Sequence, residues 1–107
     1  MRELAQHRVV PPRRLAGWRR RFRLARTLGE LAPCSFVIES VKEEVALKRA
    51  IFGELERHLA PDAVIASNTS SLPITILQAR LRHPGRLVGK HWGEPAHIMR
   101  YLEIIPG

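Results

Sequence analysis

Three short apolar runs, each followed directly by polar side chains, constrain the fold of this chain more than any other feature. They are S-F-V-I-E-S-V at 35–41, V-I-A at 64–66 and L-V-G-K-H at 87–91. Runs of this length that are rich in β-branched residues are typical of buried strands, and we predict a strand at each. A further apolar run at 101–105 predicts a fourth strand.

Two segments between these runs carry helical patterns. In 43–59 the large apolar residues recur at helical steps, namely Leu47, Ile51, Phe52, Leu55 and Leu59. This spacing predicts an amphipathic helix. A second helix is predicted from 72 to about 82, with Ser71 as its N-cap. The alternation of strands and helices predicts an α/β fold with a mainly parallel sheet.

The net charge of +8 is concentrated near the N-terminus. Residues 1–32 hold nine arginines against two glutamates, whereas residues 33–107 hold nine basic and eight acidic residues. Apolar residues recur at helical steps here too, at Leu15, Trp18, Phe22, Ala25 and Leu28. We therefore predict an Arg-rich, partly helical leader at 1–27 and a domain at 28–107. A surface helix is the first interpretation; a basic helix on membrane or nucleic acid and a disordered leader remain alternatives.

Size and composition limit the remaining possibilities. A chain of 107 residues is long enough for one small domain. Its single cysteine, Cys34, excludes an internal disulfide and fits a reducing compartment, so we expect a cytoplasmic protein. No apolar run approaches the roughly 20 residues that span a bilayer, and no transmembrane segment is expected.

Polar residues follow the predicted strands at 39–43, 67–71 and 91–94. The carboxyl ends of parallel strands meet at one edge of a sheet, where α/β proteins bind ligands. The three sets are therefore predicted to form one site, although ordinary loop residues could give the same pattern.

Several motifs lie in the same order along the chain: F-V-I-E-S-V-x-E, L-K-R-A-I-F, A-S-N-T-S-S-L, the G-x-H at 89–91, and L-E-I-I. With them, residues 28–107 resemble the second half of the NAD-binding domain of the L-3-hydroxyacyl-CoA dehydrogenases. The resemblance implies an incomplete Rossmann-like, three-layer fold. It also implies an oxidoreductase that uses NAD to interconvert 3-hydroxyacyl-CoA and 3-oxoacyl-CoA in fatty-acid metabolism.

The resemblance implies a role for each matching residue. His91 matches the catalytic base, and an unperturbed imidazole pKa of about 6.5 suits proton transfer near neutral pH. Glu103 matches the carboxylate that orients this imidazole. Ser70 matches the hydroxyl that binds substrate next to the nicotinamide. Glu43 and Lys48 match positions that contact the cofactor.

One position departs from the family pattern. Many members read H-F-x-N-P after the catalytic histidine, and their asparagine contacts the cofactor. Here the run is H-W-G-E-P, so Glu94 takes that place. A carboxylate has no N–H to donate, which predicts a divergent branch.

The chain also lacks parts that the resemblance requires. No G-x-G-x-x-G turn is present to hold a pyrophosphate, and the family's helical domain is absent. We therefore expect a truncated member that is inactive alone, with an unpaired sheet edge covered by self-association or by a partner chain.

Other functions are weaker interpretations. The main rival is a non-catalytic interaction module whose basic segment binds nucleic acid, anionic lipid or protein, although the near-neutral remainder makes nucleic acid unlikely. A targeting leader is a third. A hydrolase triad lacks the G-x-S-x-G turn, and the Cys and His residues lack zinc-site spacing, so no metal is expected.

Overall fold

The computed structural model describes residues 11, 13, 16–96 and 98–107. In chain order its elements are η1 (Trp18–Arg21), η2 (Leu28–Leu31), β1 (Phe36–Glu39), α3 (Val45–His58), β2 (Val64–Ser67), α4 (Ile74–Gln78), η3 (Pro84–Arg86), β3 (Leu87–Trp92) and β4 (Leu102–Ile105). The four strands form one sheet in the order β1-β2-β3-β4. β1, β2 and β3 are parallel, and β4 runs antiparallel to β3. The predicted α/β fold with a mainly parallel sheet is confirmed.

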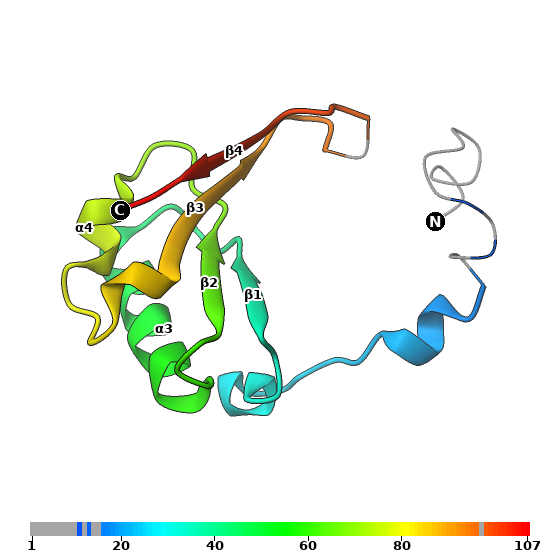
Figure 1. The fold of residues 1–107 in the computed structure, drawn as a ribbon, viewed down its shortest axis with the longest axis horizontal. Helices are drawn as coiled ribbons and strands as arrows, with labels where there is room; N and C mark the ends of the chain where they lie inside the picture. The colour runs from blue at the N-terminus through cyan, green and yellow to red at the C-terminus, as the bar shows by residue number, and fades with distance from the viewer. Residues whose placement is uncertain (1–10, 12, 14–15, 97) are drawn as a thin grey trace.

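One face of the sheet is covered by α3 and α4 (Figure 1). The core lies between these layers and comprises Val37, Phe52, Leu55, Leu59, Ala63, Ile65, Ile74, Leu77 and Leu87. Gly89 allows the close approach of α4 to β3, because a Cβ there would lie 3.1 Å from the side chains of Ile74 and Ile105. We call this side the covered face.

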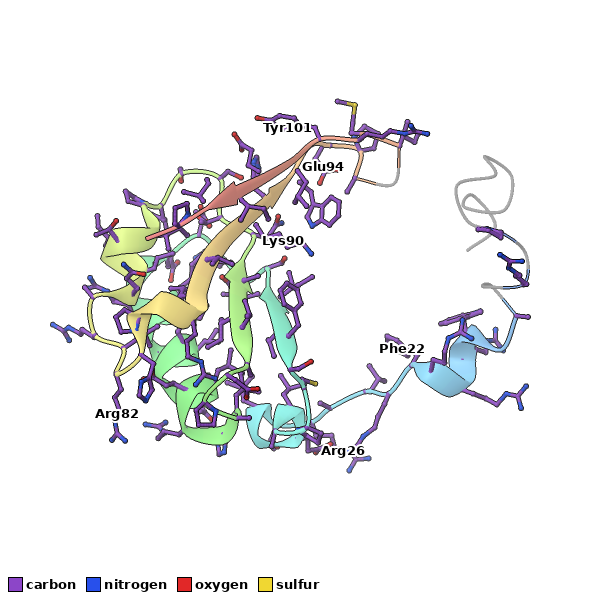
Figure 2. All side chains as sticks on the ribbon, viewed as in Figure 1. Phe22, Arg26, Arg82, Lys90, Glu94 and Tyr101 are labelled. Carbon is purple, nitrogen blue, oxygen red and sulfur yellow. The ribbon has the colours of Figure 1, made fainter. Side chains whose placement is uncertain are left out.

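The opposite side, here the open face, has no helix over it among the described residues. Val37 points to the helices and is 9% exposed, whereas its neighbour Ile38 is 48% exposed. The prediction that β1 is buried is therefore wrong for its outward residues, because the second layer that would bury them is not formed by the described chain. Lys90 lies on the open face (Figure 2), with Nζ 4.8 Å from the ring centroid of Phe36 and 4.9 Å from that of Trp92.

Both long helical predictions need adjustment. α3 is present, but Leu47 is exposed and Lys48 takes the inward position one residue later. α4 ends at Gln78, earlier than predicted. The prediction of Ser71 as its N-cap is wrong, because the hydroxyl of Ser71 donates to Glu43 instead. Thr69 Oγ1 accepts the N–H of Leu72, 3.0 Å away.

The helical steps of the apolar residues from 15 to 28 do not give one continuous helix in the described residues 16–28. They form the 3-10 turn η1, then extended chain, then the start of η2. Gly17 has a φ of 67°, outside the helical range, and Phe22 is extended. The segment runs away from the sheet (Figure 1), so its apolar stripe has no surface to pack against, and a short unsupported helix is unstable in water. Leu15 lies outside the described residues.

Candidate active site

The pairing of β3 with β4 brings His91 and Glu103 together. They are direct register partners in the antiparallel pair, the arrangement in which side chains on one face come closest. His91 Nδ1 lies 2.9 Å from Glu103 Oε2. A residue pair twelve positions apart in sequence thereby becomes one hydrogen-bonded unit.

Ser70 extends this pair into a row of three side chains. It lies in the turn after β2, and its Oγ is 3.1 Å from Nε2 of His91. Hydrogen bonds from His91 and from Tyr101 hold the pKa of Glu103 below its usual range. An ionised Glu103 can only accept, so Nδ1 of His91 carries a proton, and in the neutral imidazole Nε2 is then the acceptor. The row of hydroxyl, imidazole and carboxylate can therefore take a proton at Nε2.

The turn that carries Ser70 is held by Glu43, from the loop before α3. Its Oε1 accepts the N–H of Ser70 at 3.1 Å, the N–H of Ser71 at 3.2 Å, and the hydroxyl of Thr69. Burial raises the pKa of Glu43, but hydrogen bonds from Thr69, the Ser71 N–H, Lys48 and the Ser70 N–H outweigh it and lower that pKa to about 2. Glu43 is thus a fixed anion that positions the serine turn.

Lys48 supports Glu43 from within the fold. Its side chain is fully buried, with Nζ 2.7 Å from Glu39 Oε1 and 3.2 Å from Glu43 Oε2. Glu39 in turn accepts the hydroxyl of Ser67 at 2.6 Å. Because the ammonium of Lys48 is enclosed by these partners, the geometry favours a supporting role behind Glu43 over direct contact with a cofactor.

Glu94 stands apart from the other predicted site residues. It is exposed in the loop after β3, close to Tyr101 (Figure 2), and its carboxylate has no hydrogen-bond or ion-pair partner within the described chain. The structure thus brings Ser70, His91 and Glu103 together, places Glu43 and Lys48 directly behind Ser70, and leaves Glu94 unconnected to them.

Comparison with known proteins identifies the kind of site. The family model described as "3-hydroxyacyl-CoA dehydrogenase, NAD binding domain" matches residues 1–107. The chain belongs to the 3-hydroxyacyl-CoA dehydrogenase family. Its sheet is that of a Rossmann-like dehydrogenase domain, which confirms the resemblance and the type of cofactor domain predicted from the motifs.

Three relatives illustrate the range of the family. A 3-hydroxybutyryl-CoA dehydrogenase of Bradyrhizobium diazoefficiens is 43% identical over 78% of this chain and 28% of its own length. A 5-formyl-3-hydroxy-2-methylpyridine 4-carboxylate 5-dehydrogenase of Mesorhizobium japonicum is 41% identical over 66% of this chain and 23% of its own. The crystal structure of (S)-3-hydroxybutyryl-CoA dehydrogenase from Ralstonia eutropha superposes with a TM-score of 0.82 at 27% identity, over 95% of this chain and 36% of that one. The chain thus spans little more than a third of these proteins at most.

The sequence analysis did not predict the buried ion pair behind the candidate site or the contact of Tyr101 with Glu103. Glu39 sits at an inward position of β1, and Lys48 lies on the same inward stripe of α3 as Phe52 and Leu55. Opposite charges on two facing apolar surfaces were the available signal for an ion pair. Tyr101 lies two residues before Glu103 and therefore on the same side of the strand, which could have predicted its contact with that carboxylate.

The residues at the sheet edge fit one end of NAD. A proton acceptor and a hydroxyl donor stand side by side at the end of parallel strands, where the reacting end of a nucleotide cofactor belongs. The sequence has no Gly-rich turn for the pyrophosphate. Among the described residues no group of three or more His, Cys, Asp or Glu could hold a metal ion, and no helix is long and apolar enough to cross a membrane.

Proposed function

We propose that this chain carries the proton-transfer site of an NAD-dependent 3-hydroxyacyl-CoA dehydrogenase. The reaction is the interconversion of 3-hydroxyacyl-CoA and 3-oxoacyl-CoA in fatty-acid metabolism. The observation that carries the proposal is the row of Ser70, His91 and Glu103, whose hydroxyl, imidazole and carboxylate are linked by bonds of 3.1 and 2.9 Å. Membership of the family supplies the reaction.

In this proposal His91 is the catalytic base. Its Nε2 takes the proton of the substrate 3-hydroxyl, and the imidazolium that forms is stabilised by Glu103 at Nδ1. Bound NAD would supply the hydride acceptor for C3, the carbon that becomes the carbonyl. In the reverse direction His91 returns the proton to the oxygen of the 3-oxo group.

Ser70 is proposed to hold the substrate oxygen next to Nε2. Its backbone N–H is tied to Glu43, so the hydroxyl is presented on a fixed turn. The side chain of Glu43 is 37% exposed. We propose that its exposed part faces the cofactor. Lys48 then acts on the cofactor through Glu43. We retain Glu94 as a cofactor-side residue on sequence position alone.

The domain boundary and the covering of the open face complete the proposal. We propose that residues 28–107 are a partial domain, and residues 1–27 a leader, because Leu28 and Leu31 are packed against the core whereas residues 16–27 are exposed. We propose that the open face and the free edge of β1 are covered by self-association or by a partner chain, which would complete the cofactor site. The proposed location is the cytoplasm, with Cys34 reduced.

The test is NAD titration of the purified chain by calorimetry, together with acetoacetyl-CoA reduction followed by NADH absorbance. His91→Gln should lower turnover by about 10²-fold or more, since a positioned general base contributes that much. His83→Gln is the control, because His83 lies in the turn before η3 and its ring contacts none of the three row residues. Turnover that survives in His91→Gln, or a self-associated, folded protein that neither binds NAD nor turns over, would contradict the proposal.

A further inference from the structure

The carboxylate of Glu103 is held at both oxygens by different side chains. Oε2 faces Nδ1 of His91 at 2.9 Å, and Oε1 accepts the phenol O–H of Tyr101 at 2.8 Å. A carboxylate bound at one oxygen can still turn about its terminal bond, whose torsion is broad. A second partner on the other oxygen fixes the plane of the group.

The backbone explains why the phenol reaches this position. Beyond the last register pair of β3 and β4, the N–H of Gly93 donates to the carbonyl of Tyr101 at 3.1 Å, so the two residues lie opposite each other. Tyr101 and Glu103 are two positions apart and share one side of the strand. Figure 2 shows Tyr101 at the start of β4, near the loop that carries Glu94.

Gly93 provides the space for the tyrosine ring. A Cβ at position 93 would lie 3.2 Å from Cδ1 and 3.3 Å from Cβ of Tyr101, which is tighter than ordinary van der Waals contact. Any side chain at 93 would press the ring away from its present place. Gly93 and Tyr101 are therefore matched, and the match determines where the phenol O–H points.

We propose that Tyr101 is a positioning residue for the proton transfer at His91, which fixes the Glu103 carboxylate through its phenol and depends on Gly93 for its own place. The inference rests on the proposed function. Tyr101 does not touch the reacting atoms; it acts on His91 only through Glu103. Its effect is to keep Oε2 on Nδ1 and thereby to keep Nε2 as the proton acceptor.

Electrostatics support this role. The hydrogen bond to Glu103 raises the pKa of Tyr101, so the phenol remains a donor beyond the pH at which an ordinary tyrosine ionises. Hydrogen bonds from His91 and then from Tyr101 lower the pKa of Glu103, so it remains a carboxylate rather than taking the proton of Nδ1. The titratable groups that face the Glu103 carboxylate in these contacts are thus His91 on β3 and Tyr101 just before β4.

A test that needs no turnover uses the fact that Tyr101 is the only tyrosine in the chain. Phenolate absorbance therefore reports this residue alone, and it should ionise above the ordinary tyrosine pKa of about 10. Glu103→Gln should move the titration back toward the ordinary value, and Gly93→Ala should do so in part. Glu94→Gln, which removes a nearby carboxylate without removing this bond, should leave it unchanged. An unchanged titration in Glu103→Gln overturns the inference.

A second measurement follows Glu103 at acidic pH, so that the test does not depend on the fold remaining intact at high pH. In Tyr101→Phe the carboxyl ¹³C resonance of Glu103 should titrate at a higher pH than in the unmodified chain, because one of the two hydrogen bonds that favour the anion is lost. An unchanged Glu103 titration contradicts the inference.

Measurements of kcat and KM then distinguish a failure of this inference from a failure of the proposed function. Tyr101→Phe should lower kcat by about tenfold with KM unchanged, since it removes one charge-assisted hydrogen bond from the positioning group. If His91→Gln abolishes turnover but Tyr101→Phe leaves kcat unchanged, the proposed function stands and the positioning role is wrong. If the unmodified chain has no turnover, the two titrations still decide whether the phenol holds Glu103.

Discussion

The two faces of the sheet are made from the same strands and differ in what lies over them. Val37 and Ile38 are adjacent in β1, yet the first is almost fully buried and the second about half exposed. Both are β-branched, so the strand sequence does not distinguish them. The difference comes from α3 and α4, which cover one face only. Burial in this chain is therefore decided by the helices and not by the composition of the strands.

The two faces also differ in their polar groups. Glu39, Ser67, His91 and Glu103 all occupy positions whose side chains alternate toward the covered face. Lys90 is the polar residue in the middle of the open face, where its ammonium lies over two aromatic rings. Polar groups on the covered face are linked into a network, and this network holds the candidate site at the strand ends.

Removing the central charge of that network should have the largest effect. Lys48→Met leaves Glu39 buried without its partner, which should destabilise the fold by about 3–5 kcal/mol. Lys42→Met is the matched control, because Lys42 pairs with Glu44 on the exposed surface and should cost less than about 1 kcal/mol. The free energies of unfolding come from urea denaturation followed by circular dichroism.

The double variant Lys48→Met with Glu39→Leu tests whether the unpaired charge of Glu39 causes this loss of stability. Removing both charges leaves no uncompensated ion in the core, so much of the lost stability should return, although the hydroxyl of Ser67 loses its acceptor. Equal losses for Lys48→Met and Lys42→Met would show that the buried pair is no more important than the surface one.

A matched pair of isoleucines compares the two faces directly. Ile65→Ala removes a fully buried side chain from the covered face and should cost about 2–5 kcal/mol in unfolding free energy. Ile104→Ala removes a side chain that is 59% exposed on the open face and should cost a fraction of that. Similar losses at both positions would mean that the open face is buried in solution.

Sedimentation velocity of the same two proteins identifies the cause of such a result. If the open face mediates self-association, Ile104→Ala should weaken a concentration-dependent oligomer, while Ile65→Ala should not weaken it specifically. A partner chain of another kind would leave the purified protein monomeric at all concentrations.

The order of strands and helices could be predicted because it depends on local patterns. The runs at 64–66 and 87–91 and the stripe of Leu55 and Leu59 each identify one element from its own residues. The segment 15–28 has an equally regular stripe and forms no continuous helix over the described 16–28, since nothing packs against it. Amphipathic spacing predicts a helix only where a second surface exists.

The residues of the candidate site also differ in how far the sequence predicts them. His91, Glu103 and Ser70 could be named from the family motifs, and the sheet register then brings them into contact. Tyr101 carries no family motif. Its spacing from Glu103 predicts that it lies on the same side of the strand, but the space for its ring also depends on the missing Cβ of Gly93. Such a contact depends on residues of two strands, so no single motif identifies it.

The smallest effect on the free energy of unfolding is expected for Glu43, which holds the turn that carries Ser70. Its pKa of about 2 in the fold lies below the ordinary 4.5, so its contribution to stability is complete above about pH 4.5 and is lost as pH falls toward 2. Because its side chain is more than one third exposed, solvent screening should limit this contribution to about 1 kcal/mol. Glu43→Gln should therefore unfold at lower urea concentration than the unmodified chain at pH 6, and the two proteins should have the same stability near pH 2.

Glu44→Gln is the control. It removes a neighbouring surface carboxylate paired with Lys42 and should change that pH dependence far less. If the two variants lose stability in parallel over this range, the hydrogen bonds of Glu43 do not hold the turn, and Ser70 must owe its position to His91 instead.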